Sequence, residues 1–178
     1  PYMQKEDAKP QTIAYEYITK IEQLDKTQFS EKEQFHIDVF LFSFYAGGMA
    51  PIDVCYLTWS SISISDNIID YERIKFPKSG VTPFNDGVKE IIEKHRNKCY
   101  SNFVLPILSH KHKTEVQQRG RIKRFQYELN KTLKRVAKLI DCNKDFTWYA
   151  ARGTFITKML DEDFHPIAVA KFAGNSPN

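Results

Sequence analysis

The stretch from Ser30 to Ala46, SEKEQFHIDVFLFSFYA, constrains the fold of this chain more than any other. Ser30 followed by Glu33 is a capping box, in which two side chains satisfy free backbone N–H groups at the start of a helix. The predicted helix, from about Glu31 to Ala46, carries apolar side chains around most of its circumference: Phe35, Ile37, Val39, Phe40 and Phe44. Because such a helix must be covered on most faces, we expect it at the centre of a domain.

The segments around this helix predict a mainly α-helical α+β fold. Apolar residues alternate with polar ones between Ser61 and Phe84, and turn signals interrupt them twice, which predicts a small three-stranded antiparallel sheet. The expected buried face of the sheet consists of Ile62, Ile64, Ile69, Tyr71 and Val81. Apolar spacing of three and four residues predicts further helices at about 13–24, 51–57, 85–95 and 121–140.

A chain of 178 residues that is 42% hydrophobic is long enough for one domain with a sizeable core. Residues 1–10 are polar and are interpreted as the end of a linker, and residues 11–178 as the domain. The three cysteines lack metal-ligand spacing, and the longest apolar run, residues 39–49, is too short to span a bilayer. We expect a cytoplasmic protein without a metal, and the net charge of +4 favours a polyanionic partner.

Arg152 lies among apolar residues in a further predicted helix, for which Thr147 is the expected N-cap. A guanidinium in such a position must be paired or must face a polar cleft, because an unpaired buried charge costs several kcal/mol, roughly. One interpretation is an ion pair with a nearby carboxylate. The other is an anion clamp, since the planar fork of donors on arginine matches phosphate oxygens.

The sequence YAARGTFIT, from Tyr149 to Thr157, followed by FAGNS, from Phe172 to Ser176, resembles a conserved block of the tyrosine recombinases, or phage-type integrases. In that family one helix carries His-x-x-Arg-His-Thr-Phe-Ala-Thr and a second ends in Leu-Gly-His-Ser. Arg152 matches the arginine of this block, Tyr149 replaces its first His, Gly153 its second, and Asn175 the last. Tyrosine at the first position is similar to integrases of Bacteroides-type mobile elements.

The segment GGMAPIDVCYLTW resembles the first block of the same family, Gly-Leu-Arg-x-x-Glu-Leu-x-x-Leu-x-Trp. Gly48, Asp53, Leu57 and Trp59 match it, but Ala50 occupies the position of the functional arginine. A glycine pair before proline is also simply a turn that ends a helix.

Lys75 aligns with the hairpin lysine that acts as a general acid in the family, and Lys78 is the second candidate. The alternative is a solvated surface lysine, which is the usual state of a lysine in a hairpin. Arg73, two residues before Lys75, is expected on the same strand face, and we consider it the substitute for the missing arginine. The alternative is an ion pair between Arg73 and Asp70.

A basic block between His110 and Arg124 is the candidate for contacts with DNA phosphates, which supply much of the sequence-independent affinity for DNA. It comprises Lys111, Lys113, Arg119, Arg121, Lys123 and Arg124. The alternative is a solvated loop and helix start.

The resemblance implies a helical catalytic domain that cuts and rejoins double-stranded DNA through a 3'-phosphotyrosyl intermediate, without a cofactor, as a tetramer assembled on DNA. It implies that two arginines stabilise the phosphate charge, of which Arg152 is one and Arg73 our candidate for the other, that Lys75 protonates the leaving oxygen, and that Tyr149 and Asn175 assist. We expect the nucleophilic tyrosine beyond Asn178, since Tyr149 belongs to the arginine block. The alternative function is a degenerate relative that binds DNA or assembles with partners, which Ala50, Gly153 and Asn175 favour.

Overall fold

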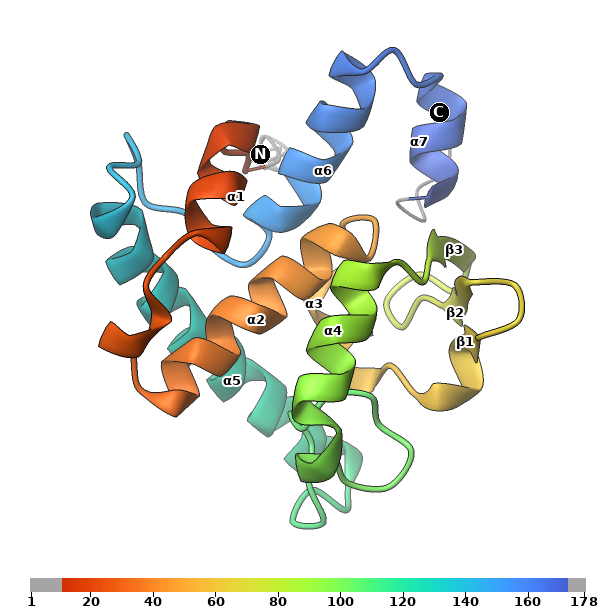
Figure 1. Ribbon diagram of the computed structural model, residues 1–178. Coiled ribbons are helices and arrows are strands. Elements are labelled where there is room, and N and C mark those ends of the chain that lie inside the picture. The colour runs from red at the N-terminus through yellow and green to blue at the C-terminus, as the bar shows by residue number, and fades with distance from the viewer. Residues whose placement is uncertain (1–10, 173–178) are drawn as a thin grey trace, which may run out of the picture.

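The computed structural model describes residues 11–172 and confirms the mainly helical α+β fold (Figure 1). Its regular elements are α1 (Tyr15–Glu22), α2 (Glu31–Tyr45), α3 (Pro51–Tyr56), β1 (Ile62–Ser63), β2 (Ile68–Glu72), β3 (Ser79–Pro83), α4 (Asp86–His95), α5 (Glu115–Leu139), α6 (Ala150–Asp161) and α7 (Pro166–Phe172). Within residues 11–172, no helix has the length and apolar character needed to cross a membrane.

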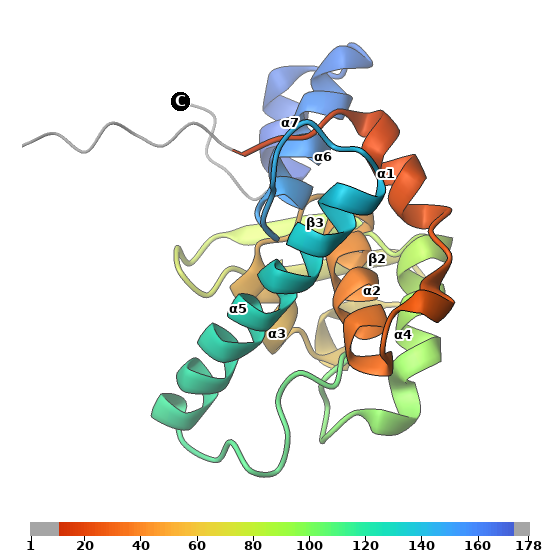
Figure 2. The ribbon, with the colours of Figure 1, turned by 90° about the vertical axis from the view of Figure 1, so that its left-hand side faces the viewer.

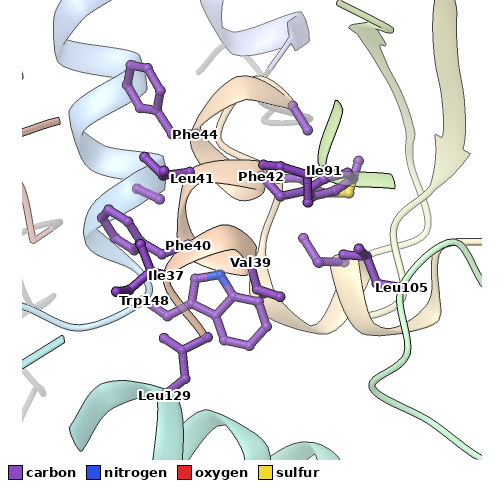
Figure 3. Packing of buried hydrophobic residues seen from close by; sticks show 14 of the residues in the cluster. Ile37, Val39, Phe40, Leu41, Phe42, Phe44, Ile91, Leu105, Leu129 and Trp148 are labelled. Atoms are coloured by element: carbon purple, nitrogen blue, oxygen red, sulfur yellow. The ribbon is translucent and has the colours of Figure 1, made fainter. Parts of the chain in front are cut away.

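Helix α2 lies at the centre, as predicted, and α1, α4, α5 and α6 pack around it (Figure 1). Its capping box forms, because Ser30 Oγ accepts a hydrogen bond from Glu33 N and Glu33 Oε2 accepts one from Ser30 N. Around α2 the core includes the fully buried Phe40 and Trp148 (Figure 3). The indole N–H of Trp148 donates to Ser43 Oγ at 2.6 Å, so this buried donor has a hydrogen-bond partner.

The sheet has the order β1-β2-β3 with both pairs antiparallel, as predicted. Ile69 and Tyr71 are buried and Ile62 is half-buried against the core, but the other two expected residues do not belong to the buried face. Ile64 lies beyond β1 and is 69% exposed. Val81 pairs with the exposed Asp70, whereas Thr82 pairs with Ile69 and is buried. Because paired residues share a face of an antiparallel sheet, the inward face of β3 is shifted by one residue from the prediction.

Gly47 and Gly48 end α2 in the left-handed region, each with φ of 72°, and Pro51 begins α3, as the sequence predicted. Helix α5 begins six residues before the predicted start at 121, because Thr114 and Gln117 form a second capping box. Figure 2 shows α5 running along one side of the molecule, with its first turns at the periphery.

Candidate active site

Arg152 lies in the first turn of α6, directly against the glycine turn that ends α2. Its Nη1 donates to the carbonyl of Gly48 at 3.1 Å. A Cβ on Gly48 would lie 3.0 Å from the Cα of Arg152, so the two backbones touch only because this residue is glycine. Burial and the nearby charge of Arg73 lower the pKa of Arg152, although an arginine still remains charged at neutral pH.

Arg73 follows directly after β2, and its side chain is only 13% exposed. Its Nε lies 3.7 Å from Oδ2 of Asp53, in the first turn of α3. The expected alternative partner, Asp70, instead accepts a hydrogen bond from Ser79 Oγ at 3.2 Å. The structure therefore places two guanidinium groups, Arg73 and Arg152, near one buried carboxylate.

Asp53 also fixes the bend between β2 and β3, a role that the sequence analysis missed. Its Oδ1 accepts a hydrogen bond from the backbone N–H of Ile74 at 2.8 Å. Burial raises the pKa of Asp53, while this hydrogen bond and the charges of Arg73 and Arg152 act in the opposite direction. The available signal was the match of Asp53 to the acidic position of the first block.

Lys75 is exposed in this bend, with its Nζ 5.7 Å from the centre of the Phe76 ring. Because β2 ends at Glu72, the strand alternation that should have placed Arg73 and Lys75 on one face does not extend to them, and that reasoning was wrong. Lys78 lies at the other end of the bend, where its carbonyl accepts a hydrogen bond from Arg73 N at 3.1 Å.

A cavity of about 510 Å³ brings several of the predicted residues together. Lys75 lines it from the bend, Tyr149 from the start of α6, and Arg119 and Lys123 from α5. The remaining lining residues are Ile52, Ile74, Ile122 and Gln126. Tyr149 is 48% exposed. Arg73 directly precedes the lining residue Ile74, and Arg152 follows Tyr149 by one helical turn, so the two arginines lie on the same two segments as these lining residues.

The basic block divides between two faces of α5. Arg119 and Lys123 face the cavity just described, whereas Arg121, Arg124 and Lys111 line a second cavity of about 740 Å³ between α5 and the segment before it. Arg121 Nε donates to the carbonyl of Ile107 at 3.0 Å. Arg121 therefore also connects that segment to the helix.

The structure also places three other residues that the sequence singled out: Lys113, Ala50 and Thr147. Lys113 is exposed just before α5, and Ala50 is buried at the start of α3. Thr147 does not cap α6, since its hydroxyl donates to Gln11, and Tyr149 occupies the N-cap position. Asn175 lies outside the described residues. Among residues 11–172, no three His, Cys, Asp or Glu side chains converge in a way that could hold a metal ion.

A model of the phage integrase family matches residues 16–176, so this chain belongs to that family. No curated protein matches it in sequence.

Solved structures of several recombinases share the fold. A XerH site-specific recombinase bound to palindromic difH substrate superposes with a TM-score of 0.71 at 14% identity, over 94% of this chain and 47% of that one. XerA recombinase gives 0.63 at 12% identity, over 94% and 57%. The Tn1549 transposon integrase in complex with circular intermediate DNA gives 0.61 at 18%, over 96% and 61%. The chain thus spans about half to three fifths of these structures.

Proposed function

We propose that this chain is the catalytic domain of a site-specific DNA recombinase that cuts and rejoins DNA through a 3'-phosphotyrosyl intermediate. The observation that carries the proposal is that Arg73 and Arg152 lie close enough together to interact, on the same two segments that bring Lys75 and Tyr149 to the cavity. Two adjacent guanidinium groups repel each other, and an anion between them relieves that repulsion. Such preorganised positive charge stabilises the crowded phosphate of a transition state.

In this proposal Arg152 and Arg73 bind the phosphate oxygens. Arg73 takes the place of the family's first arginine, whose position is occupied here by Ala50. Lys75 supplies the proton to the leaving oxygen, because it is exposed in a bend that Asp53 holds beside the arginines. Tyr149 donates a hydrogen bond, and we assign Asn175 an assisting role from the sequence pattern alone. By its resemblance to the tyrosine recombinases, the reaction needs no metal or nucleotide cofactor.

Double-stranded DNA is the proposed substrate and partner. We propose that its phosphates contact Lys78, Lys111, Lys113, Arg119, Arg121, Lys123 and Arg124. The XerH structure is bound to palindromic difH substrate and the Tn1549 integrase structure to circular intermediate DNA, which supports the proposal.

The proposed subgroup and oligomeric state rest on the sequence resemblance. We place the full-length protein in the Bacteroides-type subgroup because Tyr149 replaces the first His of the block. We also propose that it assembles as a tetramer on DNA. Its three free cysteines, Cys55, Cys99 and Cys142, favour the cytoplasm, where thiols stay reduced.

The first test measures binding of the 178-residue chain to a DNA duplex at several salt concentrations. Because phosphate contacts dominate, affinity should fall steeply with salt, and Arg152→Ala and Arg73→Ala should each weaken it. Lys20→Ala removes an exposed charge on α1 and serves as the matched control. Salt-independent binding, or equal losses in all three variants, would reject the site.

The second test uses a chain extended at its carboxyl end through the tyrosine expected there, with a nicked suicide substrate. Arg152→Ala and Arg73→Ala should abolish covalent protein–DNA adducts, and Asp70→Ala should not. If the extended parent binds DNA but forms no adduct, the degenerate DNA-binding or assembly module is the correct function. The glycine at position 153, where the family has a histidine, favoured that alternative in the sequence. The structure explains this glycine by close packing against Gln11 and Thr12.

A further inference from the structure

The chain enters the domain across the start of α6, through residues 11–13, which we call the entry strap. Gln11 Oε1 accepts hydrogen bonds from both the backbone N–H and the hydroxyl of Thr147, each at 2.7 Å. Ile13 N donates to Thr154 Oγ1 at 3.0 Å, and that hydroxyl donates back to the carbonyl of Ile13 at 3.2 Å. The strap is therefore bonded both to the turn before α6, at Thr147, and to α6 itself, at Thr154, on either side of Arg152 in the sequence.

The entry strap packs directly against Gly153. A Cβ at this position would lie 2.2 Å from the carbonyl oxygen of Gln11 and 2.7 Å from Cγ2 of Thr12. Neither approach is possible between non-bonded atoms, and the first involves backbone that cannot rotate away. Only glycine lets the strap lie directly on the helix. The absence of a histidine at Gly153 is thus a requirement of packing in this chain.

The start of α6 depends on groups from outside the helix. Its first N–H groups, those of Ala150, Ala151 and Arg152, donate to the carbonyls of Thr147, Trp148 and Tyr149 just before it, and α6 has no side-chain cap of its own. In the turn that leads into it, the N–H of Thr147 is bound by Gln11 and the N–H of Trp148 by Asn130 Oδ1 at 2.9 Å. Tyr149 and Arg152 follow immediately, so external bonds fix their backbone.

We propose that the entry strap is a positioning element for Tyr149 and Arg152, with Gln11 and Gly153 as its positioning residues. Its consequence for DNA rests on the proposed function. A displacement of the strap moves the first turn of α6 against Gly48, where Arg152 makes its hydrogen bond. Misplacement by about 1 Å can cost on the order of a hundredfold in rate.

The direct test compares two glycine substitutions in the 178-residue chain by NMR. Gly153→Ala should shift the side-chain Nε–H signal of Arg152 and the backbone amides of Gly48 and Tyr149. Gly120→Ala is the matched control, because a Cβ at Gly120, also within a helix, meets nothing within 4 Å. A folded Gly153→Ala protein in which these three signals stay in place would overturn the proposal.

Gln11→Ala keeps the test valid if Gly153→Ala does not fold. It removes only the acceptor of the two Thr147 hydrogen bonds, so it should move the same three signals. Gln11→Glu retains a suitable oxygen and should restore them. If Gln11→Ala leaves the signals unchanged, or if Gln11→Glu behaves like Gln11→Ala, the strap does not position α6 through this bond.

A double-mutant cycle on DNA affinity tests the functional consequence. Gly153→Ala should weaken binding by up to the loss that Arg152→Ala causes, about tenfold for one charged contact. In the Arg152→Ala background it should cause no further loss, whereas a merely structural effect would add. Additive losses would reject the positioning role. If Arg152→Ala itself leaves affinity unchanged, the proposed function fails, while the NMR comparison still decides on the strap.

Discussion

Asp53 combines two tasks in one buried side chain: it accepts the N–H of Ile74 and faces Arg73. We expect Asp53→Ala to destabilise the fold by about 2–4 kcal/mol, because the backbone N–H of Ile74 loses its acceptor and the guanidinium groups of Arg73 and Arg152 lose a nearby negative charge. Asp53→Asn keeps an acceptor oxygen and should cost about half as much. Denaturant unfolding of both variants measures this. Equal losses would show that the hydrogen bond to the bend contributes little.

The same pair of variants separates stability from DNA binding at the residue scale. Asp53→Asn removes the negative charge while it retains the bend, so the arginine pair should bind phosphate at least as tightly as in the parent. Asp53→Ala releases the bend that carries Lys75. It should weaken DNA binding even at temperatures where the protein is fully folded. The measurement is the dissociation constant of both variants at one salt concentration.

Helix α5 presents its basic residues on two faces, and the faces should differ in function. Removing Arg119 and Lys123 together should reduce the slope of log affinity against log salt by about 2, roughly one unit for each phosphate contact. The fold should stay as stable as in the parent, because both side chains are exposed. A matched double variant, Arg121→Ala with Arg124→Ala, should also destabilise the protein, since Arg121 holds Ile107. An unchanged salt slope for the first pair would make that face a solvated surface.

Two glycines in regular elements should respond to alanine in opposite ways. Gly120 lies in open space on α5, so Gly120→Ala should stabilise by about 0.5–1 kcal/mol through helix propensity alone. Gly80 in β3 packs on Tyr71, whose ring would lie 2.8 Å from an added Cβ. Gly80→Ala should therefore destabilise by about 1–3 kcal/mol as the ring is displaced. Thermal unfolding of the two variants gives both signs directly.

The stability of the whole molecule should fall as the pH is lowered from 6.5 toward 4. Burial, followed by the charge of Lys32, lowers the pKa of His36 to about 4 from its ordinary 6.5. The folded state thus binds the proton less readily than the unfolded chain, so the stability from neutral His36 is complete above pH 6.5. It is lost on acidification, by about 3 kcal/mol at pH 4.

His36→Gln provides the control, because glutamine can still bond Thr132 but does not titrate. The difference in unfolding free energy between parent and variant should shrink by that amount between pH 7 and pH 4. A constant difference would contradict the assignment. Below pH 4 a second loss should follow from Asp38. Burial opposes its ionisation, but hydrogen bonds from His95 and Lys94 and the charge of Lys26 lower its pKa to about 2.

Local patterns in the sequence predicted the elements correctly wherever the deciding interactions were local. The capping box of Ser30 and Glu33, the glycine turn and the proline at the start of α3 depend on neighbouring residues, and each formed as expected. The inward face of β3 was misassigned because strand register is set by pairing with β2. The predicted start of α5 was six residues too late, because the prediction did not include the capping box of Thr114 and Gln117.

The sequence by itself determined the central apolar helix, the fold class and the candidate residues Arg152 and Lys75, because periodicity and motif spacing are properties of the chain. Only the tertiary structure decided that Arg73 lies near Arg152 and Asp53, that the basic block divides, and that Gly153 seats the entry strap. Arg73 and Asp53 are 20 positions apart in the sequence, and Gly153 and Gln11 are 142 positions apart. No local pattern encodes them, since they depend on how the helices pack around α2.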